Sequence, residues 1–572
     1  MNTGDTAFML IATALVFFMT PGLAFFYGGL VRRKNVCNTM MACVAIMGLS
    51  VVLWTRFGYS LAFGGNHGGI IGDFRWIALN GVGWEAGPYA DTIPHLVFCA
   101  FQMMFAMITP ALITGSLVGR MKFKALFLFV TLWSFVVYYP LAHMVWGEGG
   151  LLAAIGSVDF AGGDVVHISS GISALVLAII LGRRRGYEQV TYRIHNIPFV
   201  VLGASLLWFG WFGFNGAAAT TIEDLGSIFL TTTVAPAIAT VTCMIFTWIR
   251  YGKPDVSMCL NASLAGLVGI TAPCDVTDAF GATMIGIVSG LLVVFGVWLL
   301  DYKLHVDDPV GAVAVHMMNG IWGTIAVGLF ATSSAPGYAI ALEGGTIKGE
   351  GLFYGGGFTQ LGLQLLGFVS VAAWAAVCMV IVFTVIKATI GLRASKEEEI
   401  RGLDIMEHGL SSAYAGFEFG GMDFVDGDVD VIGSESMETS VPALVKTSDA
   451  GDGKKITKVE ILMKQERFER FKKAMNDIGV TGMTVTQVLG CGTQKGAPEY
   501  YRGVPMDIQL LPKTQVEMVI SSVPVMDVIN ATRKALYTGH IGDGKIFVYD
   551  VEDVVKVRTG ESGYDALQGE DD

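Results

Sequence analysis

The chain has 572 residues, of which 53% are hydrophobic and only 15% are charged. An ordinary soluble domain carries about 25% charged residues, so a wholly soluble protein is excluded. Residues 1–390 hold 17 basic and 18 acidic residues, whereas the shorter stretch 391–572 holds 20 and 31. This distribution indicates a membrane domain followed by a soluble one, and the net charge of −12 does not suit a nucleic-acid-binding protein.

Apolar segments of about 20 residues can cross a bilayer as helices. We predict eleven, near residues 7–31, 39–61, 95–118, 125–145, 165–182, 197–214, 226–248, 256–272, 279–300, 309–331 and 359–388. Basic residues follow the first, third, fifth and seventh segments, beginning at Arg32, Arg120, Arg183 and Arg250. Positive connections stay in the cytoplasm, so the N-terminus is predicted outside and the C-terminus inside the inner (cytoplasmic) membrane. A cleaved signal peptide is the competing interpretation of the first segment, although its flank lacks the basic residues that such peptides need.

The chain after the first 390 residues divides into three predicted parts. Residues 391–414 form a charged tail, and residues 415–453 form a flexible acidic linker rich in Gly, Asp and Ser. From residue 454 to 572 a strand–helix–strand pattern occurs twice, which predicts an α+β ferredoxin-like domain with an antiparallel sheet.

Two histidines, His167 and His316, fall inside predicted membrane helices rich in small residues. Ionisable side chains are costly in a bilayer, so each marks a functional site by default. Two imidazoles that meet there can share a hydrogen bond, hold a small polar species and relay a proton. The alternative is that each histidine only bonds a backbone carbonyl between helices, and spacing alone does not separate the two.

Other membrane residues have both a structural and a functional interpretation. Asp159 stands just before the fifth segment, where a carboxylate accepts backbone N–H bonds at a helix start, and we favour that structural role. Aromatic faces hold ammonium-type cations, but aromatic residues in membrane helices also serve packing and interfacial belts. The aromatic candidates near the external side are Phe105, Trp146, Trp211 and Phe214.

Long motifs now give the membrane part a recognisable pattern. Residues 1–414 resemble the Amt/Mep/Rh ammonium transporter family, in its bacterial Amt branch. The resemblance rests on PGLAFFYGGLVRRKN (21–35), FQMMFAMITPALITG (101–115), AHMVWGEGGLL (142–152), DFAGGDVVHISSG (159–171), WFGFNG (211–216) and DDPVGAVAVH (307–316). It implies an eleven-helix trimer with a separate pore in each subunit.

The resemblance also implies residue roles. His167 and His316 match the family's twin pore histidines, and Phe105 and Phe214 match its stacked phenylalanine gate. Trp146 and Phe105 match the external ammonium-recruiting site, and Asp159 matches the essential carboxylate. Ala218 stands where a serine usually completes the external site, so that a hydrogen-bond acceptor is missing there.

Residues 454–572 resemble a PII signal-transduction protein of the GlnK/GlnB type. The motifs are GVTGMTV (479–485), GCGTQKG (490–496), LPK (511–513), TGHIGDGKIFV (538–548) and VEDVVKVRTGE (551–561). Members of that family are trimers that bind ATP or ADP between subunits and bind 2-oxoglutarate together with Mg-ATP. Without the resemblance, the glycine-rich stretch would be interpreted as a tight turn with surface cations.

The PII resemblance assigns ligand contacts residue by residue. Gln494 would coordinate Mg²⁺, and Lys513 would pair with a carboxylate of 2-oxoglutarate. Arg502, in the loop 492–508, matches the arginine that enters the mouth of a transporter pore. The nucleotide site would be lined by Gly482, Met483, Thr484, Gly542, Asp543, Gly544, Lys545, Lys556 and Arg558.

These features predict an ammonium transporter that conducts NH4⁺/NH3 and is gated in cis by a fused PII domain sensing ATP, ADP and 2-oxoglutarate. The rival prediction is an ammonium sensor that transports little and signals through the PII domain. An enzyme is not predicted, because no nucleophile–base set or metal-ligand cluster is evident, and transport needs no cofactor. The expected partners are the lipid bilayer and two further copies of the chain, whose PII domains trimerise beneath the pores.

Overall fold

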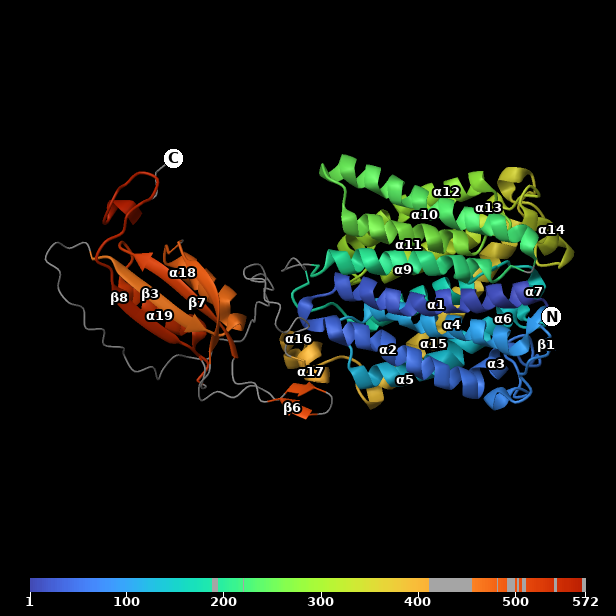
Figure 1. Ribbon diagram of the computed structural model, residues 1–572, viewed down its shortest axis with the longest axis horizontal. Coiled ribbons are helices and arrows are strands. Elements are labelled where there is room, and N and C mark those ends of the chain that lie inside the picture. Colours follow the sequence, from blue (N-terminus) through green and yellow to red (C-terminus); the bar gives the residue numbers. More distant parts are fainter. Residues whose placement is uncertain are drawn as a thin grey trace. The chain divides into compact units, whose positions relative to one another are not determined.

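The computed structural model describes residues 1–187, 194–219, 221–410, 455–480, 482–490, 499–501, 504–506, 511–539 and 543–567. Two compact units are distinguished, one that ends at His408 and one that contains the chain from Gly409 onward. The first unit is a bundle of helices and the second is built around a sheet (Figure 1).

The helices of the first unit run side by side along its length (Figure 1). In chain order the α-helices are α1 (Thr3–Leu30), α2 (Val36–Leu53), α3 (Tyr59–Phe63), α4 (His95–Ile113), α5 (Phe123–Trp133), α6 (Tyr139–Trp146), α7 (Leu151–Ile155), α8 (Ser169–Leu181), α9 (Ile197–Gly216), α10 (Ile222–Tyr251), α11 (Val256–Thr271), α12 (Ala279–Trp298), α13 (Asn319–Phe330), α14 (Pro336–Glu343) and α15 (Thr359–Thr389). Short π-helices continue or begin several of them. They are η2 (Trp54–Gly58) between α2 and α3, η5 (Ser134–Tyr138) between α5 and α6, η6 (Gly163–Ile168) before α8, η7 (Leu299–Leu304) after α12 and η8 (Val313–Met318) before α13. A short hairpin of β1 (Ala86–Gly87) and β2 (Ala90–Pro94) precedes α4, and two short helices, α16 (Lys396–Arg401) and α17 (Leu403–His408), follow α15.

Ten helical segments within the described residues are long and apolar enough to cross a membrane. The helix α11, which corresponds to the predicted segment 256–272, is a shorter apolar helix of 16 residues. Lipid offers no partner to backbone N–H and C=O groups, so an apolar chain in a bilayer satisfies them within helices. The predicted helical membrane class is confirmed, whereas the number of eleven spanning helices stays a prediction.

Glycines bring α1 and α9 into backbone contact. A Cβ atom added at Gly203 would lie 2.3 Å from the backbone nitrogen of Phe26, and one added at Gly29 would lie 2.6 Å from Cγ2 of Val200. Small residues allow membrane helices to approach this closely, and the gain is dispersion energy that a larger side chain would forfeit. The pair therefore forms a rigid wall of the bundle.

The two ends of the bundle differ in charge. One end, which we call the basic end, contains the connections around Arg32, Arg120 and Arg184. The chain after α15 packs there, because Lys122 N donates to Leu392 O at 3.1 Å and Ala394 N donates to Arg120 O at 2.6 Å. The opposite end contains the connection 64–94 and the segment 147–162.

The second unit holds a four-stranded antiparallel sheet with strand order β4–β7–β3–β8. Its elements are β3 (Thr457–Met463), α18 (Phe468–Asp477), β4 (Thr484–Gly490), β5 (Glu499–Tyr501), β6 (Val504–Met506), β7 (Leu511–Ile520), α19 (Val525–Leu536) and β8 (Lys545–Asp550). Alternate residues of β3, such as Val459 and Ile461, are buried against Phe471 of α18 and Val528 of α19. The strand order is that of two interleaved β–α–β units, so the predicted ferredoxin-like fold is confirmed.

Candidate functional site

The structure brings the two membrane histidines together inside the bundle. His167 lies on η6 and His316 on η8, and their rings are nearly parallel with centroids 5.3 Å apart. Both side chains are buried. Both ring nitrogens of His167, and Nδ1 of His316, have no hydrogen-bond partner among the described residues. The alternative of a bond to a backbone carbonyl is therefore not found for His167.

A series of aromatic rings leads from the opposite end of the bundle to this histidine pair. Phe105 and Phe214 face each other with centroids 4.3 Å apart, and Trp146 meets Phe105 edge-on at 6.0 Å. On the inner side, Phe214 stacks on His167 with centroids 5.9 Å apart, and Trp211 stacks on His167 at 5.5 Å.

Two hydrogen bonds orient the indole rings of this series. Trp146 Nε1 donates to the backbone oxygen of Asp159 at 2.9 Å, and Trp211 Nε1 donates to Thr271 Oγ1 at 2.9 Å. The ring faces are therefore fixed, and both indole N–H groups of the pair already have an acceptor.

An apolar cavity lies next to the histidines. Its lining consists of aliphatic side chains together with His167, His316, Trp211 and Phe214. The remaining lining residues are Met19, Leu23, Ile108, Leu112, Val166, Leu207 and Leu264. A cavity of this composition cannot hydrate an ion, whereas the imidazole nitrogens can bond a small neutral molecule.

Asp159 is saturated with backbone N–H donors at the start of η6. Its carboxylate accepts from the N–H groups of Gly162, Gly163, Asp164 and Val165 at 2.5 to 2.9 Å. The structural role favoured from the sequence is what the geometry displays. The same carboxylate also places negative charge near the start of the helix that carries His167.

Sequence reasoning missed a second copy of this arrangement. Asp308 precedes His316 by eight residues, as Asp159 precedes His167, and it accepts from Val313 N at 2.8 Å and from Ala314 N at 3.3 Å. In both copies a glycine with positive φ, Gly162 at 119° and Gly311 at 80°, turns the chain into the π-helix. Alignment of the two Asp-x-x-Gly-x4-His stretches could have found it.

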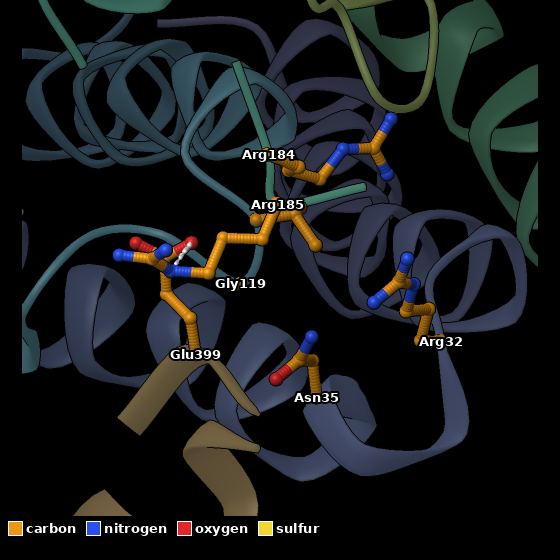
Figure 2. Close-up of a pocket in the computed structure, with 7 residues that line it drawn as sticks. Arg32, Asn35, Gly119, Arg184, Arg185 and Glu399 are labelled. Carbon is orange, nitrogen blue, oxygen red and sulfur yellow. Dashed lines mark ion pairs between the residues drawn. The ribbon is translucent and has the colours of Figure 1, made fainter. Parts of the chain in front are cut away.

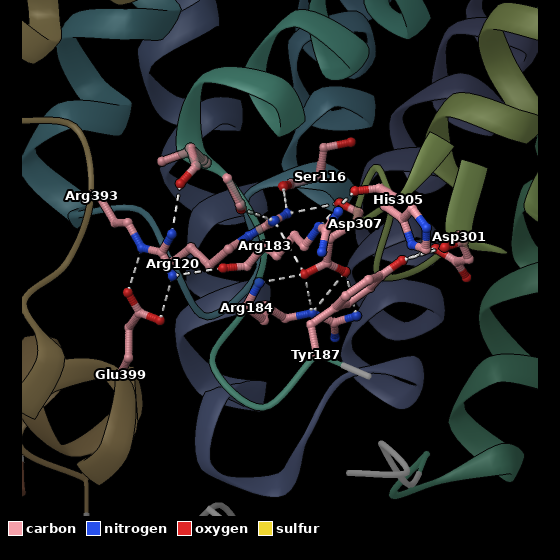
Figure 3. A network of polar contacts seen from close by, with 12 residues as sticks. Ser116, Arg120, Arg183, Arg184, Tyr187, Asp301, His305, Asp307, Arg393 and Glu399 are labelled. Carbon is pink, nitrogen blue, oxygen red and sulfur yellow. Dashed lines mark hydrogen bonds and ion pairs between the residues drawn. The ribbon is translucent and has the colours of Figure 1, made fainter. Parts of the chain in front are cut away.

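The basic end is held by buried ion pairs (Figure 3). Asp307 pairs with Arg120 at 3.3 Å and with Arg184 at 2.7 Å, and the Asp307 and Arg120 side chains are wholly buried. Burial raises the pKa of Asp307, but the two guanidinium groups outweigh it and hold that pKa below its usual range. Burial lowers the pKa of Arg120 to about 10, against the opposing charge of Asp307. The sequence showed these arginines only as an orientation signal.

A pocket at the basic end is lined by Arg32, Asn35, Val118, Gly119, Arg184, Arg185 and Glu399 (Figure 2). Glu399 comes from α16 and pairs with Arg393 at 2.6 Å and with Arg185 at 3.7 Å. The tail also caps two membrane helices. Asp404 accepts from Asn38 N of α2 at 2.7 Å, and Glu407 accepts from Phe123 N of α5 at 3.1 Å.

In the second unit, several predicted ligand residues lie near the turn into β8. Asp543 accepts from Thr538 N at 2.7 Å, and Gly544 has a φ of 121° with no room for a Cβ, which would lie 2.4 Å from Leu462 O. Lys545 follows at the start of β8. Lys513 lies on β7 opposite Val488 of β4.

Other predicted residues belong to other segments of the second unit. Val551, just after β8, bonds Ile456 at the far end of β3, and Lys556 lies beyond it. A six-residue strand spans roughly 20 Å, so the chain leaves β8 about that far from Lys545 before it continues to Lys556 and Arg558. Gly482, Met483 and Thr484 lie at the start of β4. Gln494, Arg502 and Gly542 lie outside the described residues.

The sequence profile of the Ammonium Transporter Family matches residues 7–414, which is more than half of the chain. The chain belongs to the ammonium transporter family. The profile of the nitrogen regulatory protein P-II matches residues 456–561. An ammonium transporter is therefore fused to a PII regulatory domain, as both motif resemblances predicted, and neither family is one of enzymes.

Relatives agree with this family. An ammonium transporter of Mycobacterium tuberculosis is 44% identical over 440 residues, which cover 73% of this chain and 90% of that protein. One of Bacillus subtilis is 41% identical over 413 residues, which cover 72% and 98%. A solved structure described as a sensor Amt protein superimposes with a TM-score of 0.63 at 29% identity, covering 70% of this chain and 98% of its own. Mep2 of Candida albicans superimposes with a TM-score of 0.63 at 30% identity, covering 69% and 87%.

Proposed function

We propose that each subunit conducts ammonium along the aromatic series and through the apolar cavity past His167 and His316. The observation that carries this proposal is the pair of buried, nearly parallel imidazoles beside an apolar cavity; both nitrogens of His167 and Nδ1 of His316 have no hydrogen-bond partner among the described residues. Trp146 and Phe105 form the recruiting site, Phe105 and Phe214 form the gate, and Asp159 fixes the helix that carries His167.

The mechanism follows from the cost of burying charge. NH4⁺ is attracted to the faces of Trp146 and Phe105 by cation–π interaction, which partly replaces its hydration. The apolar cavity cannot replace the remaining hydration, so the ion gives up a proton to water outside the cavity, and NH3 moves on, bonded in turn to the imidazoles. K⁺ has no proton to lose and is rejected at the same barrier.

We further propose the topology drawn from the charge pattern. Eleven helices, α11 included, cross the inner membrane, with the N-terminus outside and the basic end in the cytoplasm. The membrane domain comprises residues 1–390, the tail 391–414, the linker 415–453 and the PII domain 454–572. On this assignment Trp146 lies at the external mouth of the pore.

The regulatory domain is proposed to bind ATP or ADP, and Mg²⁺ with 2-oxoglutarate, between the subunits of a trimer. The chain leaves β8 at the end opposite Lys545 before it continues to Lys556 and Arg558, which supports a site completed by a neighbouring subunit. Gln494 then coordinates Mg²⁺, Lys513 pairs with 2-oxoglutarate, and Arg502 blocks the pore of the same assembly when the domain docks.

The test is the ammonium-elicited current across membranes that contain the purified full-length protein. We expect a small current with ADP and a larger one with Mg-ATP and 2-oxoglutarate, and loss of current in a double variant with His167→Ala and His316→Ala. A variant with Glu397→Gln, at an exposed position of the tail, serves as the control. Intact nucleotide binding without current in either ligand state contradicts transport and leaves an ammonium sensor.

A further inference from the structure

A second carboxylate, Asp164, lies beside Asp159 and does not line the cavity. It is on η6 but turns toward α13 and α15, and only 1% of its surface is exposed. Thr324 Oγ1 of α13 donates to Asp164 Oδ1 at 2.8 Å. A Cβ atom added at Gly367 of α15 would lie 3.7 Å from Asp164 Oδ2, so the absent side chain of this glycine makes room for the carboxyl group.

The two carboxyl groups are unequally stabilised. Asp159 accepts four backbone N–H bonds, one of them from the Asp164 backbone itself at 2.8 Å. Asp164 receives one hydroxyl hydrogen bond, and in the described part of the chain no lysine or arginine pairs with either group. Two adjacent buried carboxylates without a cation cannot both be ionised, and N–H donors favour the charged form of the one that they contact.

The groups that face Asp164 from the neighbouring elements are uncharged apart from Asp159. α13 contributes Thr324, and α15 contributes Gln364, whose amide is bonded to the backbone of Val158 and Thr324. The nearest other titratable side chain on η6 is His167, which faces the cavity. Nothing on these elements supplies a positive charge that would keep Asp164 ionised.

An unpartnered oxygen borders the same space. Ser157 Oγ is buried and has no hydrogen-bond partner among the described residues. The Cβ position of Gly367 that lies near Asp164 Oδ2 is also 1.9 Å from Ser157 Oγ. No hydrogen bond joins Ser157 Oγ to Asp164 Oδ2, but both oxygens border the space that the missing side chain of Gly367 leaves open, so the Oδ2 side of the carboxyl group faces a polar hydroxyl rather than a cation.

We propose that Asp164 is a proton-binding site, a carboxylic acid protonated at Oδ2, in the space that Ser157 Oγ also borders, while Asp159 alone carries the negative charge. The proton comes from hydronium in bulk water: one O–H bond of H3O⁺ breaks, an O–H bond forms on Asp164 Oδ2, and a water molecule is released. The consequence for transport rests on the proposed function: an arriving cation meets one negative charge at the start of η6 rather than two, and is not trapped there.

Infrared difference spectroscopy of the full-length protein in lipid at pH 7.5 tests the proton directly and needs no transport. We expect Asp164→Asn to remove one carboxylic-acid carbonyl band, and the exposed control Glu397→Gln to remove only carboxylate bands. Loss of carboxylate bands without an acid band in Asp164→Asn would overturn the proposal.

Two further variants assign the band and leave Asp164 in place. Thr324→Val removes the hydrogen bond to Oδ1 and should shift the acid band to higher frequency. Ser157→Ala removes the hydroxyl group that borders the space beside Oδ2 and should shift the same band. A spectrum unchanged in both variants would also overturn the proposal, even if Asp164→Asn failed to fold.

Discussion

Each of the two buried histidines follows, by eight residues, an aspartate that caps the start of its helix. Asp159 accepts four backbone N–H groups, whereas Asp308 accepts two and leaves Oδ1 without a partner among the described residues. The two halves of the path therefore share a backbone design but differ in how fully their carboxylates are satisfied. Because fewer N–H groups stabilise its charged form, Asp308, which lies before its membrane helix, is predicted to be protonated more easily than Asp159.

Asp308 makes a testable contribution to the pH dependence of stability. Burial raises its pKa to about 6, although N–H bonds from Val313 and Ala314 oppose the shift. The unfolded pKa is near 3.9, so between about pH 4 and pH 6 the folded protein keeps a proton that the unfolded chain has lost. Stability must fall as the pH rises through this window, by about 3 kcal/mol in total.

The variant Asp308→Asn should remove this component. We expect its free energy of unfolding to fall less between pH 4 and pH 7 than that of the unaltered protein, measured by thermal unfolding of both in the same detergent. Burial also raises the pKa of Asp404, which adds the same slope to both proteins and so cancels in the comparison. Parallel pH profiles would contradict the assignment.

Ala218 offers a gain-of-function test at the proposed external mouth. It lies just after α9, where its N–H bonds Asn215 O at 3.2 Å. A serine hydroxyl there would add one hydrogen bond to a bound ammonium ion, a net gain of about 1 kcal/mol. We expect Ala218→Ser to lower the half-saturating ammonium concentration roughly fivefold, with Ala219→Ser unchanged, in concentration series of the current. Equal shifts in both variants would point away from a direct contact.

At the scale of elements, the stability of the basic end depends on one aspartate, Asp307. Asp307 is the counter-ion of Arg120, whose side chain is wholly buried and also donates to the backbone oxygens of Ser116 and Gly182. Removing one partner of a buried pair leaves a charge without compensation, which costs about 3–5 kcal/mol. Asp307→Ala should therefore lower the unfolding temperature markedly.

A double variant separates charge from packing. Arg120→Met combined with Asp307→Leu removes both buried charges while it retains apolar volume, and such replacements are often neutral or stabilising. We expect the double variant to be more stable than Asp307→Ala alone, as measured by thermal unfolding. A double variant less stable than the single one would mean that the hydrogen bonds of Arg120 matter more than its charge.

The sequence alone predicts some of these features and not others. The membrane helices follow from apolar length alone, and His167 and His316 stand out because ionisable residues are rare in such segments. The π-helical turns that place both histidines have no composition signal. The pairing of Arg120 with Asp307 joins residues 187 positions apart, which a charge count cannot reveal. Asp164 was missed because its role depends on α13 and α15, not on its own helix.

At the scale of the whole molecule, the tail connects the transporter to the regulatory domain through helix ends. Asp404 caps α2 and Glu407 caps α5, and an acidic side chain at a helix N-terminus is stabilised by the helix dipole as well as by the hydrogen bond. The chain therefore leaves the basic end from a fixed point at His408, and the acidic segment 415–453 begins a few residues later. The proposed regulation in cis then depends on the effective concentration of the PII domain that this tether sets.

The composition of residues 415–453 predicts a flexible tether, and a flexible tether of about 40 residues holds a partner at an effective concentration in the millimolar range. Cutting the tether should turn the docking of the PII domain from an intramolecular step into a bimolecular one. We expect a protease site inserted within residues 415–453 to leave the ADP-inhibited current unchanged before cleavage. After cleavage and washing of the vesicles, the current in ADP should rise to the level seen with Mg-ATP and 2-oxoglutarate, because the released domain is diluted far below the tethered concentration. Inhibition that survives washing would mean that the PII trimer stays bound by its own affinity, and that the fusion fixes stoichiometry rather than gating.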